Sequence, residues 1–304
     1  MGPEASVRES AASRGMTPVT LCIAAACELQ GKPRIVLCTD WKAEETLGGT
    51  SLGSSENADK LYWIGKGWAA LIAGSESSGQ ELVRAFAKHM KTVKKFEWGE
   101  LQEELRKPLL EHRDAVIEAH LRRTIGFSRD WFFDKGKEKL PPETVRDCIA
   151  DMKRVSLGAS MIISGFVTAQ FNPGSPRRRQ HPLIFEVQMN GSTRTCKDFT
   201  AIGEGKLIAI PTLKQRDQNA SHGLLQTLYQ AYEAKRLSEI IPSVGETHSI
   251  DVLAPGGSVK SLSDAGYELL DRLYTRFGPR KIKQEKFEEL FKLERKHLEP
   301  FEFD

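Results

Sequence analysis

The sequence predicts an α+β fold in which two antiparallel sheets lie between layers of helices. Apolar, β-branched runs come in pairs, and the segments between them are too short for a crossover connection. From residue 76 onward the apolar spacing changes from that of strands to that of helices. The same succession of strands and then helices returns in the second half. Strands gathered into hairpins, with helices kept apart from them, favour layered α+β over a parallel α/β sheet.

The first half is predicted to hold two hairpins and two helices. Residues 28–33, with a glycine and a proline, supply the turn of the first hairpin. Residues 48–55, rich in Gly, Ser and Thr, are predicted to be a loop. The predicted strands are 19–27, 34–41, 60–64 and 68–73, and the predicted helices are 76–96 and 97–123.

The second half is predicted to repeat this arrangement more loosely, after a segment of different character. That segment carries three consecutive aromatics, Trp131, Phe132 and Phe133, then a lysine-rich stretch, and then Pro141-Pro142 at the start of a further helix. The predicted strands beyond it are 158–167, 183–189, 193–196 and 247–253, and the predicted helices are 206–215, 222–240, 262–277 and 281–297.

Composition and charge exclude several classes of protein. Lys and Arg total 44 against 41 Asp and Glu, a net charge of +3, whereas a dedicated nucleic-acid-binding protein would show a strong basic excess. No apolar run approaches the roughly 18 residues of a membrane span. The five cysteines form no CxxC pair, so neither a metal site nor a cofactor is expected. The polar first residues lack the apolar core of a secretory signal, which favours a cytoplasmic location.

Residues 49–53 match G-x-S-x-G, the motif of the nucleophile elbow in α/β hydrolases. That motif acts only between a preceding strand and a following helix. Here a charged segment precedes the motif and a loop is predicted after it. We therefore interpret these residues as loop sequence.

Four residues at the ends of predicted strands are candidates for one site. Thr20 begins the first strand, Asp40 closes the second, Lys60 opens the third and Gly74 follows the fourth. Antiparallel neighbours bring such ends close together, which would let the hydroxyl, the carboxylate and the ammonium converge.

Several short segments carry a resemblance to a known family. They are a Thr-led strand from Thr20, residues 36–42 (VLCTDWK), 57–61 (NADKL) and 71–74 (LIAG), and more loosely 201–205 (AIGEG) and 229–235 (YQAYEAK). With these residues the chain resembles proteasome-type β-subunits, which are N-terminal-nucleophile (Ntn) hydrolases. The resemblance implies a four-layer αββα sandwich of two antiparallel sheets between helix layers.

The same resemblance implies how the chain is divided. Residues 1–19 would be a leader or propeptide, and residues 20–304 a single Ntn-hydrolase-like domain. Residues from about 124 to 155 have no counterpart in that family and are interpreted as an insertion. Helices at about 262–297 would be C-terminal additions.

The resemblance also implies a function, the cleavage of peptide (amide) bonds by a threonine peptidase. Its nucleophile would be the hydroxyl of Thr20, with the α-amine of the same residue as base. An α-amine titrates near 7.7–8.0, so it can accept a proton near neutral pH. Lys60 would favour the reactive protonation state, Asp40 would orient Lys60, and the backbone N–H of Gly74 would stabilise the oxyanion.

The position of the nucleophile leaves one alternative. Thr20 is internal in the sequence, so cleavage after Val19 would be needed to expose it. A chain processed at Met16 would begin with Thr17 instead. An odd offset of three residues along a strand points to the opposite face, which favours Thr20.

Some departures from the family leave the activity open. Self-processing subunits have Gly where Val19 stands, and the family's Gly-Ser-Gly reads Gly203-Glu204-Gly205 here. The family's late Asp and Ser near the site have only approximate counterparts here, Glu239 and Ser243. The loop of the first hairpin is also longer than is usual in the family. These departures favour an alternative, a catalytically inactive proteasome-fold structural or binding subunit. A third hypothesis is another amide hydrolysis or transfer on the same fold.

The partners expected from the resemblance are a peptide or protein substrate, further copies of the chain and an ATPase unfoldase. The copies would form a homo-oligomer arranged as a ring. Neither a nucleic acid nor a membrane is expected as a partner. Three consecutive aromatics cannot all point inward from one short segment, so residues 131–133 are predicted to lie at or near an interface.

Overall fold

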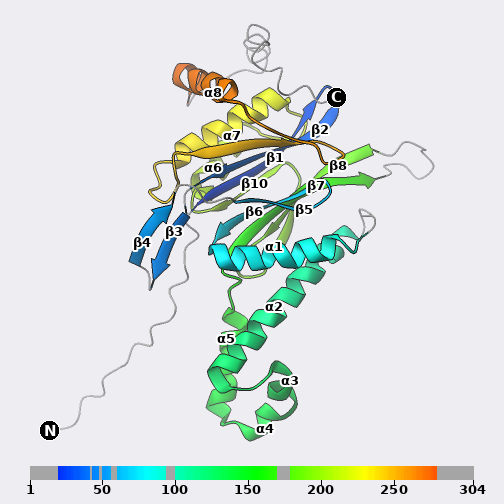
Figure 1. The fold of residues 1–304 in the computed structure, drawn as a ribbon, viewed down its shortest axis with the longest axis vertical. Helices are drawn as coiled ribbons and strands as arrows, with labels where there is room; N and C mark the ends of the chain where they lie inside the picture. Colours follow the sequence, from blue (N-terminus) through cyan, green and yellow to red (C-terminus); the bar gives the residue numbers. More distant parts are fainter. Residues whose placement is uncertain are drawn as a thin grey trace, which may run out of the picture.

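Two antiparallel five-stranded sheets form the centre of the molecule (Figure 1). The computed structural model describes residues 20–41, 43–47, 50–55, 60–93, 100–169 and 179–278. The first sheet has the strand order β10-β1-β2-β11-β12 and the second the order β5-β6-β7-β8-β9. The strands of the first sheet are β1 (Leu21–Leu29), β2 (Lys32–Asp40), β10 (Phe199–Gly203), β11 (His248–Leu253) and β12 (Val259–Ser261). Those of the second are β5 (Leu61–Gly65), β6 (Trp68–Gly74), β7 (Ala159–Ala169), β8 (Arg179–Val187) and β9 (Thr193–Cys196).

Helices pack on the outer faces of the two sheets (Figure 1). The first sheet is covered by α6 (Lys206–Gln215), α7 (Leu224–Ser238) and α8 (Asp264–Phe277). The second is covered by α1 (Glu76–Met90) and the first turns of α2 (Leu101–Ile125). The predicted α+β class with two antiparallel sheets is confirmed.

The alternation of side chains along β1 explains why both of its faces are buried. Leu21 and Ile23 belong to the apolar cluster beneath α6, α7 and α8. Cys22, Ala24 and Ala26 point the other way, into a cluster shared with the second sheet. Successive residues of a strand face opposite sides of a sheet, so this strand can read as one apolar run.

The β1–β2 hairpin closes through a turn of two residues. Leu29 pairs with Lys32, and the intervening Gln30 and Gly31 have φ angles of 53° and 72°. Both angles lie in the left-handed region, as a type I′ turn requires. The expectation of a long loop was wrong, because strand pairing continues through Pro33, which pairs with Glu28.

Part of the predicted loop over residues 48–55 is a strand. β3 (Ala43–Leu47) and β4 (Thr50–Ser55) form a separate antiparallel hairpin, in which Ser51 pairs with Thr46. The next described element after β4 is the strand β5, so the G-x-S-x-G segment lacks the helix of a nucleophile elbow. The Gly-, Ser- and Thr-rich composition of β4 led to its prediction as a loop, although backbone pairing does not require apolar side chains.

Two short strands, β10 and β12, were missed by the sequence prediction. β12 has three residues and pairs only with β11. β10 has five residues and extends the first sheet by pairing with β1. The three residues of β12 are too few for a period-two pattern to be recognised.

The C-terminal half of α2 and the helices after it form an arm that projects from the sheets (Figure 1). The arm contains α3 (Arg129–Trp131), η1 (Phe132–Gly136), α4 (Lys137–Lys139) and α5 (Pro142–Arg154). It has its own apolar core of Ile117, Leu121, Phe132, Cys148 and Met152. α2 continues to Ile125, so this separate core begins within that helix, before residue 124.

The three consecutive aromatics of the arm have different surroundings. Phe132 is fully buried in the core of the arm, whereas Phe133 is 47% exposed. Trp131 stacks on Phe127, with ring centroids 3.7 Å apart. The expectation that the aromatics cannot all point inward is correct, but Phe132 packs within its own chain and is not a candidate for an interface.

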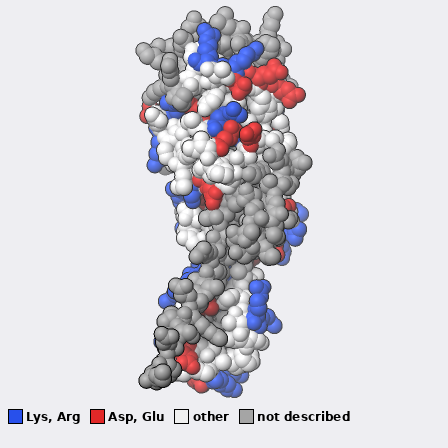
Figure 2. Space-filling view, turned by 90° about the vertical axis from the view of Figure 1, so that its left-hand side faces the viewer, with Lys and Arg blue, Asp and Glu red and all other residues white. Residues whose placement is uncertain are grey.

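The surface carries acidic and basic side chains close to one another on the face shown in Figure 2. Within the described ranges, no helix combines the length and apolarity needed to cross a membrane. Four predictions concern residues outside those ranges. They are the leader at 1–19, Thr17 as nucleophile, the segment 57–59 and the last predicted helix, 281–297.

Candidate functional site

The candidate site lies where β1 begins and β2 ends. Cys22 pairs with Thr39, so Thr20 and Asp40 approach each other beyond the last paired residues. Thr20 itself is one residue before β1. Lys60 directly precedes β5 and therefore reaches the site from the second sheet. The site thus spans the two sheets.

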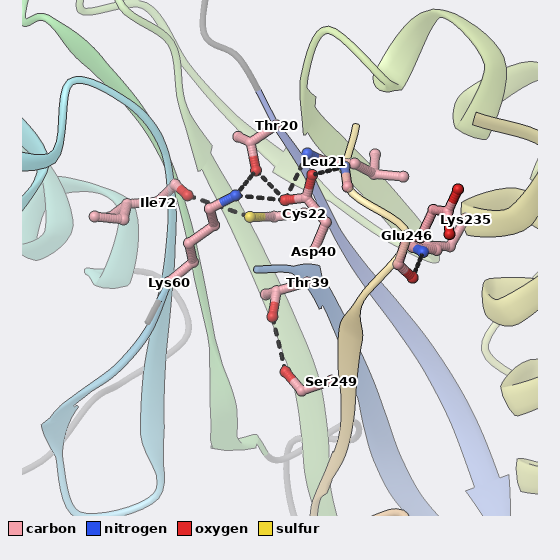
Figure 3. Close-up of polar contacts among 11 residues, drawn as sticks. Thr20, Leu21, Cys22, Thr39, Asp40, Lys60, Ile72, Lys235, Glu246 and Ser249 are labelled. Atoms are coloured by element: carbon pink, nitrogen blue, oxygen red, sulfur yellow. Dashed lines mark hydrogen bonds and ion pairs between the residues drawn. The ribbon is translucent and has the colours of Figure 1, made fainter. Parts of the chain in front are cut away.

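The hydroxyl of Thr20 contacts both charged groups (Figure 3). It donates a hydrogen bond to Asp40 Oδ1 and accepts one from Lys60 Nζ. The ammonium of Lys60 is also 2.5 Å from Asp40 Oδ1. All three residues are buried: Thr20 is 1% exposed, Asp40 0% and Lys60 6%. The predicted convergence of these three residues is therefore present in the structure.

Backbone amides complete the surroundings of Asp40. Its Oδ1 accepts a hydrogen bond from the N–H of Leu21 at 3.2 Å, and its Oδ2 accepts one from the N–H of Gly245 at 3.0 Å. With the hydroxyl and the ammonium, these bonds satisfy both oxygens of a fully buried carboxylate. Gly245 was not predicted as part of the site, because it lies more than 200 positions further along the chain.

Gly203 and Gly205 allow the chain to pass directly beside Thr20. Gly203 has a φ of 90°, and a Cβ built there would lie 2.0 Å from the carbonyl oxygen of Thr20. The N–H of Gly205 donates a hydrogen bond to the same oxygen at 3.3 Å. Any larger residue at position 203 would therefore displace Thr20. This contact was not predicted, because it depends on the pairing of β10 with β1.

Glu204, between the two glycines, accepts a hydrogen bond from Ser243 Oγ. In sequence, Glu204 departs from the Gly-Ser-Gly of the family that the chain resembles, and Ser243 is an approximate counterpart of that family's late Ser. The structure joins them in two loops that flank Thr20 and Asp40. Glu239 does not join them, since it pairs with Lys235 and Arg236.

Gly74 occupies the end of β6, two residues after Ile72. The carbonyl of Ile72 accepts a hydrogen bond from the Cys22 thiol at 3.2 Å. The N–H of Ile72 donates a hydrogen bond to the carbonyl of Lys60 at 3.1 Å. The end of β6 therefore runs beside Lys60. The contacts of the described residues do not join Gly74 directly to Thr20, so its place in the site depends on strand position alone.

Cys22 is the nearest thiol to the site. Burial strongly raises the pKa of this thiol, and the neighbouring Lys60 ammonium lowers it to a lesser extent. Only the thiolate is an effective nucleophile, so Cys22 has a packing role beneath the site rather than a chemical one. Across the described part of the chain, no three His, Cys, Asp or Glu side chains gather as ligands for a metal ion.

His248, at the start of β11, gives the site's surroundings a dependence on pH. Burial, together with the nearby Lys235 and Arg236 cations, lowers the pKa of His248 to about 4 from the ordinary 6.5, although its bond to Glu246 opposes this. Its ring lies between Tyr232 and Tyr267, with centroids 5.5 Å and 5.3 Å away. Its Nδ1 is 3.0 Å from the carbonyl oxygen of Glu246, and no described residue hydrogen-bonds the buried Nε2.

We expect the free energy of unfolding to fall as the pH drops from about 6.5 to about 4. In that interval the unfolded chain binds a proton at His248 and the folded chain does not, so protonation favours unfolding. The shift corresponds to a loss of about 3 kcal/mol from this residue. Urea unfolding of the wild type and of His248→Phe at several pH values checks this. The variant should lose less stability over the interval, and parallel profiles would contradict the prediction.

The comparisons with known proteins identify no family. No protein-family model matches this chain, and no curated protein matches it.

Proposed function

We propose that this protein is an Ntn hydrolase of the proteasome type, which cleaves peptide bonds with Thr20 after residues 1–19 have been removed. The observation that carries the proposal is the position of the Thr20 hydroxyl between a buried carboxylate and a buried ammonium. Three separate chain segments supply these groups. The face-to-face sheets with helices outside them support the four-layer αββα form of the fold.

The proposed reaction uses the α-amine that removal of the leader would create. Thr20 Oγ attacks the substrate carbonyl carbon, and its proton passes to this amine. The C–N bond then breaks and the proton moves to the leaving amine. Water hydrolyses the ester that remains, which restores the hydroxyl and releases the acid.

The neighbouring groups have separate roles in this reaction. The Lys60 ammonium stabilises negative charge as it develops on Oγ, because the two atoms are already in hydrogen-bond contact. Asp40 fixes the position of the ammonium and balances its charge. The N–H of Gly74 is assigned to the oxyanion by the resemblance to the family.

Active protein is expected to begin at Thr20, because the base must be a terminal amine. The intact mass and the N-terminal sequence of the purified protein check this, together with hydrolysis of short fluorogenic peptides. A chain that starts with methionine directly before Thr20, and loses that methionine, provides a processed control. Peptide hydrolysis by protein that keeps Met1 throughout would rule out Thr20 as the nucleophile. Intact, inactive protein whose processed control is also inactive would favour the alternative of a structural subunit.

The proposal includes a homo-oligomer arranged as a ring, with a peptide or protein as substrate and an ATPase unfoldase as partner. The exposed Phe133 and the stacked Phe127 and Trp131 on the arm support an interface there. Light scattering is expected to give a mass several times 34.0 kDa at micromolar concentration. Phe133→Glu should lower that mass, whereas Phe132→Leu, inside the arm, should leave it unchanged. A monomeric wild-type protein would contradict the prediction.

A further inference from the structure

The segment between α7 and β11 is fixed at several points around the candidate site. We call residues 239–247 the α7–β11 loop. Ser243 Oγ donates to the carboxylate of Glu204, and the N–H of Gly245 donates to Asp40 Oδ2 at 3.0 Å. The carbonyl of Thr247 accepts a hydrogen bond from the N–H of Trp41 at 3.1 Å. The loop is therefore fixed to residues at the ends of β2 and β10, beside the site.

Lys235 fixes this loop from the helix side. It lies on α7 with its side chain fully buried, and its Nζ donates to the carbonyl oxygen of Glu246 (Figure 3). The same Nζ donates to the carboxylate of Glu239. Glu246 directly follows Gly245, so the ammonium acts one residue away from the N–H that reaches Asp40. His248 Nδ1 contacts the same Glu246 oxygen at 3.0 Å.

A fully buried ammonium is expensive in free energy unless it is paired and hydrogen-bonded. An apolar side chain at position 235 would pack α7 onto the sheet without that cost. Glu239 supplies the countercharge, and it is also 3.3 Å from Arg236. The bond that a packing role does not explain is the one to the Glu246 carbonyl.

We propose that Lys235 is a positioning residue for the candidate site, because it holds the α7–β11 loop so that the N–H of Gly245 stays on Asp40. Its effect on catalysis rests on the proposed function, whereas its effect on the loop does not. Lys235 does not touch Thr20 or Lys60 and acts through the loop backbone.

Lys235→Met in the full-length protein tests this inference by amide hydrogen exchange at Gly245. The variant leaves Glu239 with Arg236 as a partner, which limits the cost of removing the ammonium. We expect exchange at Gly245 to become roughly ten-fold faster or more, relative to the amides of β1, which report global unfolding. Peptide hydrolysis should slow through kcat, with KM little changed. Lys235→Met/Glu239→Gln, which removes both charges, serves if the single variant does not fold.

A second buried ion pair, between α7 and the end of α6, provides the matched control. Glu233 of α7 accepts hydrogen bonds from Arg216 Nε and Nη2 at 2.8 Å and 2.6 Å. Arg216→Met/Glu233→Gln should change global stability while the ratio of Gly245 exchange to β1 exchange stays at its wild-type value.

The two proposals can fail separately. A folded Lys235 variant with wild-type exchange at Gly245 would overturn the positioning role, whatever its activity. Faster exchange at Gly245 in a protein that hydrolyses no peptide, even when processed, would support the positioning role and refute the proposed function.

Discussion

Thr20→Ala is expected to lower kcat/KM for peptide hydrolysis by about a thousand-fold or more, which is the order of loss when a nucleophile is removed. The substitution deletes the hydroxyl that lies between Asp40 and Lys60 and leaves their ion pair in place. The fold should survive, because the substitution removes the two hydrogen bonds of one hydroxyl, at a cost of about 1–3 kcal/mol, while Asp40 and Lys60 keep each other as partners. Thr20→Ser, which keeps a hydroxyl on the same backbone, should retain measurable hydrolysis. The measurement is steady-state hydrolysis of a fluorogenic peptide by each variant in its processed form, with Tm as the test of folding.

Thr39→Ala is the matched control for this experiment. Thr39 is buried, precedes Asp40 directly and uses its hydroxyl to contact Ser249 Oγ at 2.8 Å rather than the site (Figure 3). Thr39→Ala should lower the free energy of unfolding about as much as Thr20→Ala does, and it should leave hydrolysis near the wild-type rate. If processed Thr20→Ala hydrolyses peptides as fast as processed Thr39→Ala, Thr20 is not the nucleophile.

The central part of the site could be predicted because it depends on local features of the chain. A hairpin with a two-residue turn brings the start of one strand beside the end of the next, so Thr20 and Asp40 follow from their positions at strand ends. The β1–β2 hairpin alone does not place Lys60, since this residue precedes a strand of the other sheet. The position of Lys60 at a strand end suggested its placement, and the resemblance of the surrounding residues to the family strengthened that prediction.

The remainder of the site depends on contacts between segments far apart in the sequence. Gly203 meets Thr20 only because β10 pairs with β1, and Gly245 reaches Asp40 from the loop before β11. Nothing in the local sequence of either glycine indicates these partners. The burial of Lys235 was also not predicted, because a lysine in an amphipathic helix is usually solvated.

The fold shows the same division between local and distant information. The long helices and the apolar strands were predicted from their periodicity. The β3–β4 hairpin was missed because Gly, Ser and Thr dominate its second strand. Phe132 was misassigned for another reason. The core of the arm forms between α2 and α5, and no local sequence pattern indicates that these helices pack against each other.

The charge at position 60 is expected to have the second-largest effect on hydrolysis. Lys60→Met keeps the length of the side chain and removes the ammonium that contacts the Thr20 hydroxyl and Asp40. Hydrolysis should fall by about 100-fold or more, because a charge in contact with the reacting oxygen contributes on the order of several kcal/mol. Lys66→Met provides the matched control. Lys66 is exposed in the turn at the other end of β5, so the same substitution there should change neither hydrolysis nor stability.

A loss of hydrolysis in Lys60→Met alone would not distinguish a catalytic effect from a loss of folding. Removing one member of a buried ion pair costs about 3–5 kcal/mol, since Asp40 would remain charged, fully buried and without its cation. Lys60→Met/Asp40→Asn removes both charges and keeps an amide oxygen that can accept from the N–H of Leu21 or of Gly245. We expect this double variant to melt closer to the wild type than Lys60→Met does, and still to be inactive. Recovery of hydrolysis together with stability would show that Lys60 serves only to neutralise Asp40, and that the Thr20 hydroxyl needs no cation beside it.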